Sequence, residues 1–365
     1  MTWYAPPASW CSRCNTTKTT NPAHRTGILM SAAIQNIAFF LPETRLSNDM
    51  LAAEFPGVSA EAIYKQSGVR QRSIAEDSLT PADLAAQAAS ILFSKLHGVQ
   101  PTEIDAVLYC TEGLDYKAPA TACLLHQRLG LKPACLALDI PAGCTGFVNG
   151  LMVAQGLIGK NGIRHVLLLT SEITSKVISQ SDLHLRMLFG DGACATLISI
   201  SDQDKLGQFV FGTDGTGAKY LWVEHSGMRS PADIAWLEEQ RHNSNGLKNG
   251  RMIMKGDELL HFALTHIPSL INDTLRVNHL QEEDIDLFVF HQASGIILRS
   301  LRRKCRIPEA KFFLHLEDCG NTVSSSIPLA LQHAILQKRI QRGAKVMLVG
   351  FGVGLSWAAT VIEIA

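Results

Sequence analysis

The chain has 365 residues, of which 46% are hydrophobic and 18% are charged, with 33 Lys and Arg residues against 33 Asp and Glu residues. This length allows two domains, or two fused halves that share one core. The low charge content excludes a disordered chain, and the zero net charge gives no electrostatic footprint for a nucleic acid partner.

Residues 1–29 are rich in Trp, Pro and Thr and lack hydrophobic periodicity, so we expect a disordered extension. Within it, Cys11 and Cys14 with His24 resemble half of a zinc site, but no second Cys-x-x-Cys follows and we expect no metal. The nine cysteines are odd in number and scattered, which is typical of reduced thiols in the cytoplasm. No apolar run reaches the ~18–20 residues of a membrane-spanning helix, and residues 27–41 are predicted to hold a strand.

From Met30 onward, short apolar runs alternate with segments of helical periodicity, which predicts an α/β fold with buried strands. The predicted strands are residues 104–110, 166–170, 195–200, 285–290 and 346–349, and the predicted helices are residues 82–96, 146–158, 258–277 and 327–336.

An internal repeat relates two parts of the chain. Residues 100–110 match residues 281–291, and Gly143-Cys144-Thr145 matches Gly320-Asn321-Thr322, in both cases about 180 positions further on. The repeat predicts a duplicated unit, with residues 30–201 as the N-terminal half and residues 202–365 as the C-terminal half. Corresponding loops of the two halves are then expected to face one central cleft.

Three residues on these loops are candidates for catalysis. Cys144 follows a glycine at a strand–helix junction, where the helix dipole is expected to lower the pKa of the thiol and favour a nucleophilic thiolate. His291 ends a buried strand, and Asn321 lies in a turn before a helix. Taken singly, His291 and Asn321 would be structural residues, and Cys144 could equally be a nucleophile or an inert buried cysteine. The duplication brings them to one cleft, where the two nitrogen-bearing side chains could stabilise an enolate formed when a carboxylate leaves as CO2.

Glycines 350, 352 and 354 follow the last predicted strand. Their spacing is a weak dinucleotide signal, because no helix with an acidic partner follows them. A backbone N–H group that approaches a thioester oxygen is the better interpretation.

Six motifs resemble those of the β-ketoacyl-ACP synthase III family and occur in the family's order. They are residues 67–74 (SGVRQRSI), 143–147 (GCTGF), 188–193 (LFGDGA), 291–293 (HQA), 320–322 (GNT) and 350–354 (GFGVG). The resemblance covers residues 30–365 and implies the thiolase fold. In that fold, two βαβαβαββ halves form a five-layer αβαβα core, usually within a homodimer.

The resemblance also implies roles for the candidate residues. Cys144 would accept an acyl group as a thioester, and His291 and Asn321 would promote the decarboxylation of malonyl-ACP. The backbone N–H groups of Cys144 and Val353 would form an oxyanion hole. The reaction would be a Claisen condensation catalysed by a cytoplasmic acyltransferase, with acyl carrier protein and acyl thioesters as partners. Neither a cofactor nor a membrane would be needed.

Several positions depart from the family pattern. Ala62 and Gln66 stand where housekeeping members carry the Trp and Arg that grip coenzyme A, Leu183 replaces a second Arg, and Ile296 replaces a basic residue. We therefore expect a donor other than acetyl-CoA, delivered by a carrier protein that docks on a basic helix, although a solvated helix face explains the charges equally well. The basic residues are Arg299, Arg302, Arg303 and Lys304.

Ala118 replaces a bulky residue that, in the family, shapes the acyl pocket from the neighbouring subunit. Together with Phe189 and Phe351 it is expected to form the acyl pocket of this chain. The smaller side chain makes a longer or branched acyl group plausible, as in lipid or secondary-metabolite pathways.

One segment supports a different chemistry. Thr111-Glu112-Gly-Leu-Asp115 resembles a stretch of 3-hydroxy-3-methylglutaryl-CoA synthase, in which Glu is the general base of an aldol condensation. Glu112 is therefore a possible general base, since a carboxylate beside a catalytic thiol has a raised pKa. Acyl transfer without condensation would use the same nucleophile, and a non-catalytic partner subunit of a ketosynthase would keep the cleft for interaction only.

Overall fold

The computed structural model describes residues 31–96, 98–242 and 250–365 of the chain. The predicted extension, residues 1–29 with Cys11, Cys14 and His24, lies outside the described residues. The described strands form two five-stranded sheets and two small two-stranded sheets. None of the described helices is long and apolar enough to cross a lipid bilayer.

The two large sheets have the same strand order. The first is ordered β1-β7-β6-β4-β5 and the second β8-β14-β13-β11-β12, so the strands correspond one to one. In each sheet the three strands furthest along this order run parallel, and the first two pair antiparallel. The strands of the first sheet are β1 (Ser31–Phe40), β4 (Ala106–Cys110), β5 (Leu136–Ile140), β6 (His165–Glu172) and β7 (Gly192–Ser201). Those of the second are β8 (Val210–Thr213), β11 (Leu287–Phe290), β12 (Phe312–Phe313), β13 (Lys345–Gly352) and β14 (Ser356–Glu363).

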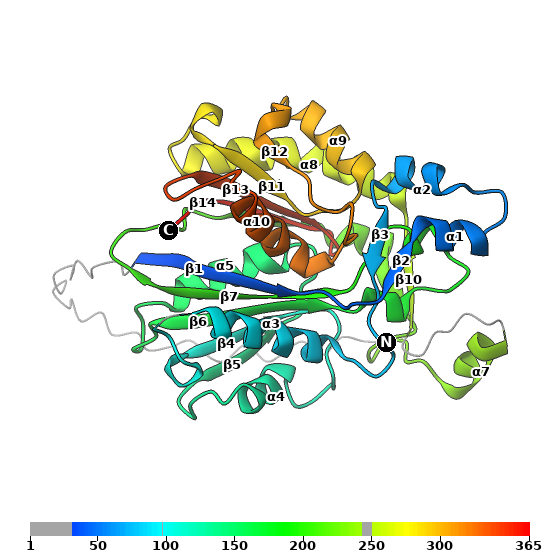
Figure 1. Cartoon of the computed structure of the whole chain (residues 1–365), viewed down its shortest axis with the longest axis horizontal. Coiled ribbons are helices and arrows are strands. Elements are labelled where there is room, and N and C mark those ends of the chain that lie inside the picture. Colours follow the sequence, from blue (N-terminus) through cyan, green and yellow to red (C-terminus); the bar gives the residue numbers. More distant parts are fainter. Residues whose placement is uncertain (1–30, 97, 243–249) are drawn as a thin grey trace, which may run out of the picture.

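The helices complete a five-layer αβαβα arrangement. Helices α3 and α4 cover the outer face of the first sheet, α5 and α10 lie between the sheets, and α8 and α9 lie on the outer side of the second sheet (Figure 1). Their bounds are α3 (Pro81–Lys95), α4 (Thr121–Arg128), α5 (Gly146–Leu157), α8 (Gly256–Val277), α9 (Gly295–Lys304) and α10 (Ser326–Leu336).

The strands are apolar on both faces because both faces are buried. In β4, Leu108 packs into the layer between the sheets and Tyr109 packs under the outer helices. In β13, Leu348 faces the central layer, whereas Val349 faces the outer cluster that contains Cys144. Since successive side chains of a strand alternate between the faces, continuous apolar runs result.

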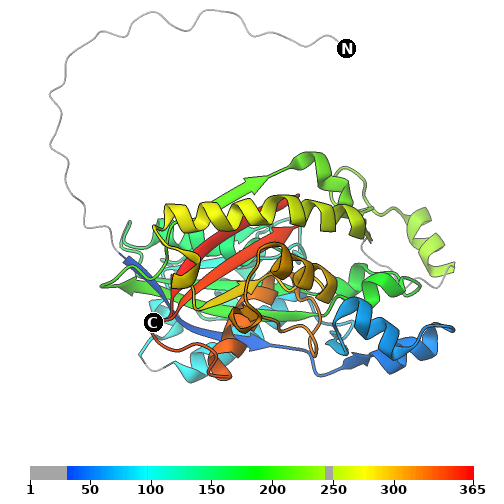
Figure 2. The same cartoon turned by 90° about the horizontal axis from the view of Figure 1, so that it is seen from above.

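The remaining elements gather at one end of the large sheets, with α7 standing apart from the rest (Figures 1 and 2). They are α1 (Asn48–Glu54), α2 (Ala60–Ser67), α6 (Leu183–Arg186), α7 (Ile234–His242), β2 (Arg45–Ser47), β3 (Gln71–Ser73), β9 (Leu221–Glu224) and β10 (Arg251–Met254). Figure 2 also shows α8 lying along the outer side of β13 and β14.

All five predicted strands and all four predicted helices are confirmed, with ends that differ by no more than three residues. The strand expected within residues 27–41 is β1. Strands β5, β8, β12 and β14 were not predicted from the sequence.

Candidate active site

The candidate residues meet where the parallel strands end. Cys144 lies between β5 and α5, and His291 directly follows β11. Asn321 pairs with Phe189 in an isolated parallel bridge, which ties the loop before α10 to the loop before β7. Loops at the carboxyl ends of parallel strands are a common place for binding sites in α/β proteins.

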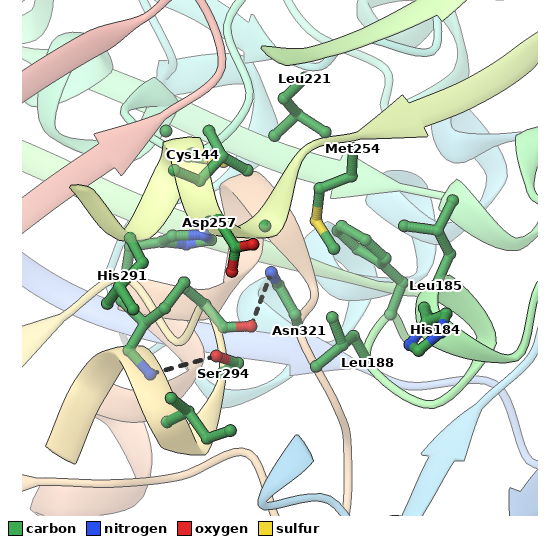
Figure 3. Close-up of a pocket in the computed structure, with 18 of the residues that line it drawn as sticks. Cys144, His184, Leu185, Leu188, Leu221, Met254, Asp257, His291, Ser294 and Asn321 are labelled. Carbon is green, nitrogen blue, oxygen red and sulfur yellow. Dashed lines mark hydrogen bonds between the residues drawn. The ribbon is translucent and has the colours of Figure 1, made fainter. Parts of the chain in front are cut away.

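Cys144, His291 and Asn321 line one cavity of about 500 Å³ (Figure 3). The structure therefore brings the three predicted residues together. Most of the other lining side chains are apolar, among them Leu185, Met187, Leu188, Phe189, Leu221, Met254, Leu259, Phe262 and Phe351.

Glycines let the end of β13 approach Cys144. A methyl group at Gly352 would lie 2.6 Å from the Cys144 Sγ atom, and one at Gly350 would lie 3.0 Å from the Cys144 carbonyl oxygen. Gly352 also has a φ of 152°, which side chains rarely adopt. The glycines at residues 350–354 therefore allow the backbone at the end of β13 to lie close to Cys144.

The electrostatics of Cys144 differ from the prediction. Burial raises the pKa of the Cys144 thiol to about 12, and the Glu112 carboxylate is the next cause. The expectation that the helix dipole yields a thiolate is therefore wrong, since removal of the sulfur from water outweighs it. The backbone N–H groups of Val353 and Cys144 act in the opposite direction, which places both groups at the sulfur.

His291 is a neutral imidazole in a fixed orientation. Its Nδ1 atom lies 2.7 Å from the Ser326 hydroxyl, and its backbone N–H donates to Val349. Burial lowers the pKa of His291 to about 3, against a hydrogen bond with the Val323 backbone. An uncharged ring can offer a hydrogen bond to a developing enolate without first losing a proton.

The carboxamide of Asn321 is also held in place. Its Oδ1 atom accepts from the Val323 backbone N–H at 2.9 Å, and its Nδ2 atom donates to the Ala293 carbonyl at 3.2 Å (Figure 3). Because Nδ2 carries two N–H groups, one remains for a ligand in the cavity. Asn321 thus presents a donor to the same space as His291.

Glu112 lies on the other side of the nucleophile turn and does not line the cavity. A methyl group at Gly143, the residue before Cys144, would lie 2.7 Å from the Glu112 carboxyl carbon. The side chain is accessible to solvent, but the surrounding protein raises the pKa of Glu112 to about 7.

Glu172, at the end of β6, is a buried carboxylate that sequence reasoning missed. It accepts hydrogen bonds from the Ser324 hydroxyl at 3.0 Å, the Glu112 backbone N–H at 3.2 Å and the Thr111 hydroxyl at 3.3 Å. Burial, and then the nearby Glu112, raise its pKa well above its usual range. A carboxylate that follows the apolar run of residues 166–169 and two polar residues was the available signal.

Two of the three predicted acyl-pocket residues line the cavity, and the third does not. Phe189 and Phe351 line the cavity, whereas Ala118 lies on an exposed loop and does not line the cavity of its own chain. A contribution of Ala118 to the neighbouring subunit stays a prediction.

The basic residues of α9 differ in their surroundings. Arg302 pairs with Glu309 at 3.3 Å, and Arg299 donates to the Lys65 carbonyl at 3.3 Å. Arg303 and Lys304 are exposed, and neither pairs with a described carboxylate.

The cavity carries acidic rather than basic groups. Asp182, His184 and Asp257 line it together with Gln66 and Ile296, and no Lys or Arg is among its described lining residues. Ala62 is exposed on α2. Across residues 31–96, 98–242 and 250–365, no three His, Cys, Asp or Glu side chains could hold a metal ion.

Comparison with known proteins gives two family matches. The 3-oxoacyl-[acyl-carrier-protein] synthase III profile matches residues 138–215, and the profile of its C-terminal part matches residues 275–364. The chain is 33% identical to the β-ketoacyl-[acyl-carrier-protein] synthase III of Caldanaerobacter subterraneus over 92% of this chain and 98% of that protein. It is 31% identical to the one of Methylococcus capsulatus over 89% of this chain and 96% of that protein.

Comparison with solved structures also finds condensing enzymes of this kind. A 3-oxoacyl-(acyl-carrier-protein) synthase III superposes with a TM-score of 0.86 at 41% identity, covering 92% of this chain and all of that chain. The priming β-ketosynthase of the R1128 polyketide pathway superposes with a TM-score of 0.82 at 28% identity, covering 94% and 99%.

Proposed function

The chain belongs to the β-ketoacyl-[acyl-carrier-protein] synthase III family, and from this premise we propose that Cys144, His291 and Asn321 catalyse a decarboxylative Claisen condensation. Family membership makes the chain a condensing acyltransferase with the thiolase fold. The observation that carries the residue assignment is the single cavity shared by the three side chains.

The residues divide the chemistry between two steps. The Cys144 sulfur attacks the thioester carbonyl of the donor, the carbonyl oxygen takes hydrogen bonds from the backbone N–H groups of Cys144 and Val353, and the donor thiol leaves. A malonyl thioester then loses CO2, and His291 and Asn321 stabilise the enolate oxygen. Its carbanion attacks the acyl-Cys144 carbonyl, expels the Cys144 thiolate and yields a β-ketoacyl thioester.

The donor is an acyl group on a carrier protein rather than acetyl-CoA. The cavity carries Asp182 and Asp257 and no Lys or Arg among its described lining residues, which disfavours a ligand with several phosphates. Arg303 and Lys304 are exposed on α9, the helix whose first turn lines the cavity, and they fit the acidic surface of a carrier protein.

The acyl group is longer than acetyl or branched. The cavity measures about 500 Å³ and is lined mainly by apolar side chains, among them Leu221, Met254 and Phe262. The likeness to a priming ketosynthase of a polyketide pathway supports a role in secondary metabolism.

The working form is a homodimer. Strand β5 is an edge of the first sheet and exposes Leu136 and Leu138, with Tyr116 exposed on the loop between β4 and α4. An uncovered edge strand with exposed apolar side chains favours pairing with a second chain. The second copy would bring its Ala118 loop to the same face. We also propose a cytoplasmic location without a cofactor, which the free state of the seven described cysteines supports.

Mass spectrometry after incubation with acyl-carrier thioesters of different chain lengths tests the function. We expect an acyl adduct on Cys144 that is absent in Cys144→Ser, and its conversion to a β-ketoacyl product with CO2 release when malonyl-carrier protein is added. An adduct without CO2 release would indicate acyl transfer without condensation. No adduct with any donor would favour a non-catalytic partner subunit.

An aldol condensation would give a different product. It would use Glu112 as its general base, but the motifs around His291 and Asn321 resemble those of the ketosynthase, which favours the Claisen reaction. A condensation product that retains the carboxylate carbon of the second substrate would support the aldol reaction instead.

A further inference from the structure

His291, the titratable partner of Cys144 in the proposed reaction, is a poor acceptor for the thiol proton. The pKa of His291 is lowered to about 3, that of the thiol is raised to about 12, and the Nδ1 atom of His291 is engaged with Ser326. Transfer of the proton from sulfur to this imidazole is therefore strongly uphill. A second group has to hold the proton while the sulfur attacks the donor.

Glu112 lies beside the turn that carries Cys144. Its carboxyl group packs against the Cα atom of Gly143, so closely that a methyl group there would meet its two oxygens at 2.8 and 3.0 Å. Gly143 is bonded directly to Cys144, and Glu112 is the charged group with the largest effect on the thiol. The bare Cα atom of Gly143 is what lets the carboxyl group reach the nucleophile turn.

Glu172 holds the backbone of Glu112 in place. Its carboxylate accepts from the Glu112 backbone N–H and from the Ser324 hydroxyl, so it joins the loop after β4 to the turn that follows Asn321. Burial and the charge of Glu112 both raise the pKa of Glu172, so Glu172 keeps its proton more readily than Glu112. As the pH rises through about 7, the pair therefore gains one negative charge, on Glu112. On the cavity side, Asp182, His184 and Asp257 are further titratable groups that line the cavity with Cys144.

We propose that Glu112 is the base that takes the Cys144 proton during acyl loading, and that Glu172 is the residue that positions it. The S–H bond breaks as an O–H bond forms on Glu112, and the sulfur bonds to the carbonyl carbon of the donor. The thioester bond of the donor then breaks, and its thiolate leaves as a thiol with the proton held by Glu112. The step needs no further reactant, and it rests on the proposed function of Cys144.

Stopped-flow or quench measurement of acyl loading tests the proposal with Glu112→Gln, Glu172→Gln and the control Glu103→Gln, a carboxylate on the surface. We expect loading to slow at least ~10²-fold in Glu112→Gln, to slow less in Glu172→Gln, to recover partly in Glu112→Asp and to stay unchanged in the control. The rate for the unaltered protein is expected to rise with pH through about 7, as Glu112 ionises, and this limb is expected to vanish in Glu112→Gln.

Alkylation of Cys144 by iodoacetamide separates a base from a nearby charge. Loss of the Glu112 charge lowers the thiol pKa, so Glu112→Gln is expected to alkylate faster although it loads acyl groups more slowly. If Glu112→Gln both alkylates and loads faster, or loads at the unaltered rate, Glu112 is not the base. Failure of the unaltered protein to load any donor would instead contradict the proposed function.

Discussion

At the scale of single residues, the site depends on how closely the backbone approaches the sulfur. Gly352 has no room for a Cβ atom, because that atom would meet the Cys144 Sγ atom at 2.6 Å. The contact keeps the end of β13, with the Val353 N–H group, beside the nucleophile. A single methyl group at this position is therefore expected to disturb the proposed oxyanion hole.

Gly352→Ala is expected to reduce acyl loading at least ~10²-fold and to destabilise the fold by about 1–3 kcal/mol. Gly156→Ala is the matched control, because Gly156 is exposed in α5 and a Cβ atom there meets nothing within 4 Å. The control should leave loading unchanged and add up to ~1 kcal/mol of stability. Urea unfolding measures the stability and the loading assay measures the rate of acyl loading. Equal stability and equal loading in the two variants would show that the close contact at Gly352 is not required.

His291 makes stability depend on pH. Its folded pKa is about 3, whereas a histidine in an unfolded chain titrates near ~6.5. Between pH ~3 and ~6.5, His291 is protonated in the unfolded chain but neutral in the folded one. The free energy of unfolding is therefore highest above pH ~6.5 and falls as the pH is lowered, by about 5 kcal/mol at most. His291→Asn lacks this loss. In urea unfolding, the free energy of unfolding should fall less between pH 7 and pH 4.5 for the variant than for the unaltered protein. Equal falls would show that His291 titrates normally when folded.

The cysteine, histidine and asparagine that we propose as catalytic were selected from the sequence and line one cavity, but their electrostatics could not be predicted. Their motifs are local, whereas the pKa of Cys144 is set by burial between parts of the chain that lie far apart in sequence. Glu172 was missed for the same reason, since its partner Ser324 lies 152 positions away.

At the scale of helices and strands, burial decides what the sequence can predict. Strands β4, β6, β7, β11 and β13 are apolar on both faces and were found. Strand β5 was not predicted because it lies at the edge of the sheet. Its leucines at 136 and 138 are exposed and the residues between them are only partly buried, so it has no continuous apolar run. Strand β14 was missed because the glycines before it resemble a terminal loop rather than the turn of a hairpin with β13.

Helix α9 is the element expected to meet the carrier protein. Reversing two exposed charges with Arg303→Glu and Lys304→Glu should raise KM for an acyl-carrier donor ~10-fold or more, because the attraction to an acidic surface becomes repulsion. Added salt should shrink the difference, and kcat should change less than ~2-fold.

Lys160→Glu with Arg164→Glu is the control for α9. Both residues are exposed and lie before the amino end of β6, away from the cavity. An equal rise in KM for this pair would point to net charge rather than to a docking site on α9.

At the scale of the whole molecule, the exposed edge of the first sheet is expected to hold two chains together. Leu136→Lys with Leu138→Lys places two charges on β5 and should abolish the pairing. Light scattering after gel filtration should give twice 39.8 kDa for the unaltered chain and 39.8 kDa for the variant. Leu336→Lys, on an exposed residue at the end of α10, should leave the mass unchanged. A monomeric unaltered chain would refute the proposed homodimer.

In the proposed reaction the two halves of the chain contribute different groups, with the sulfur on one half and the decarboxylating pair on the other. An exposed tip at Asp202 and Asp204 separates β7 from β8, so a cut there would leave each five-stranded sheet whole. Each fragment would lack half of the site and would expose one side of the central α5–α10 layer, a surface that only the other fragment matches. Activity recovered on mixing the fragments would therefore report their reassembly, which makes this fold a starting point for a split-enzyme reporter.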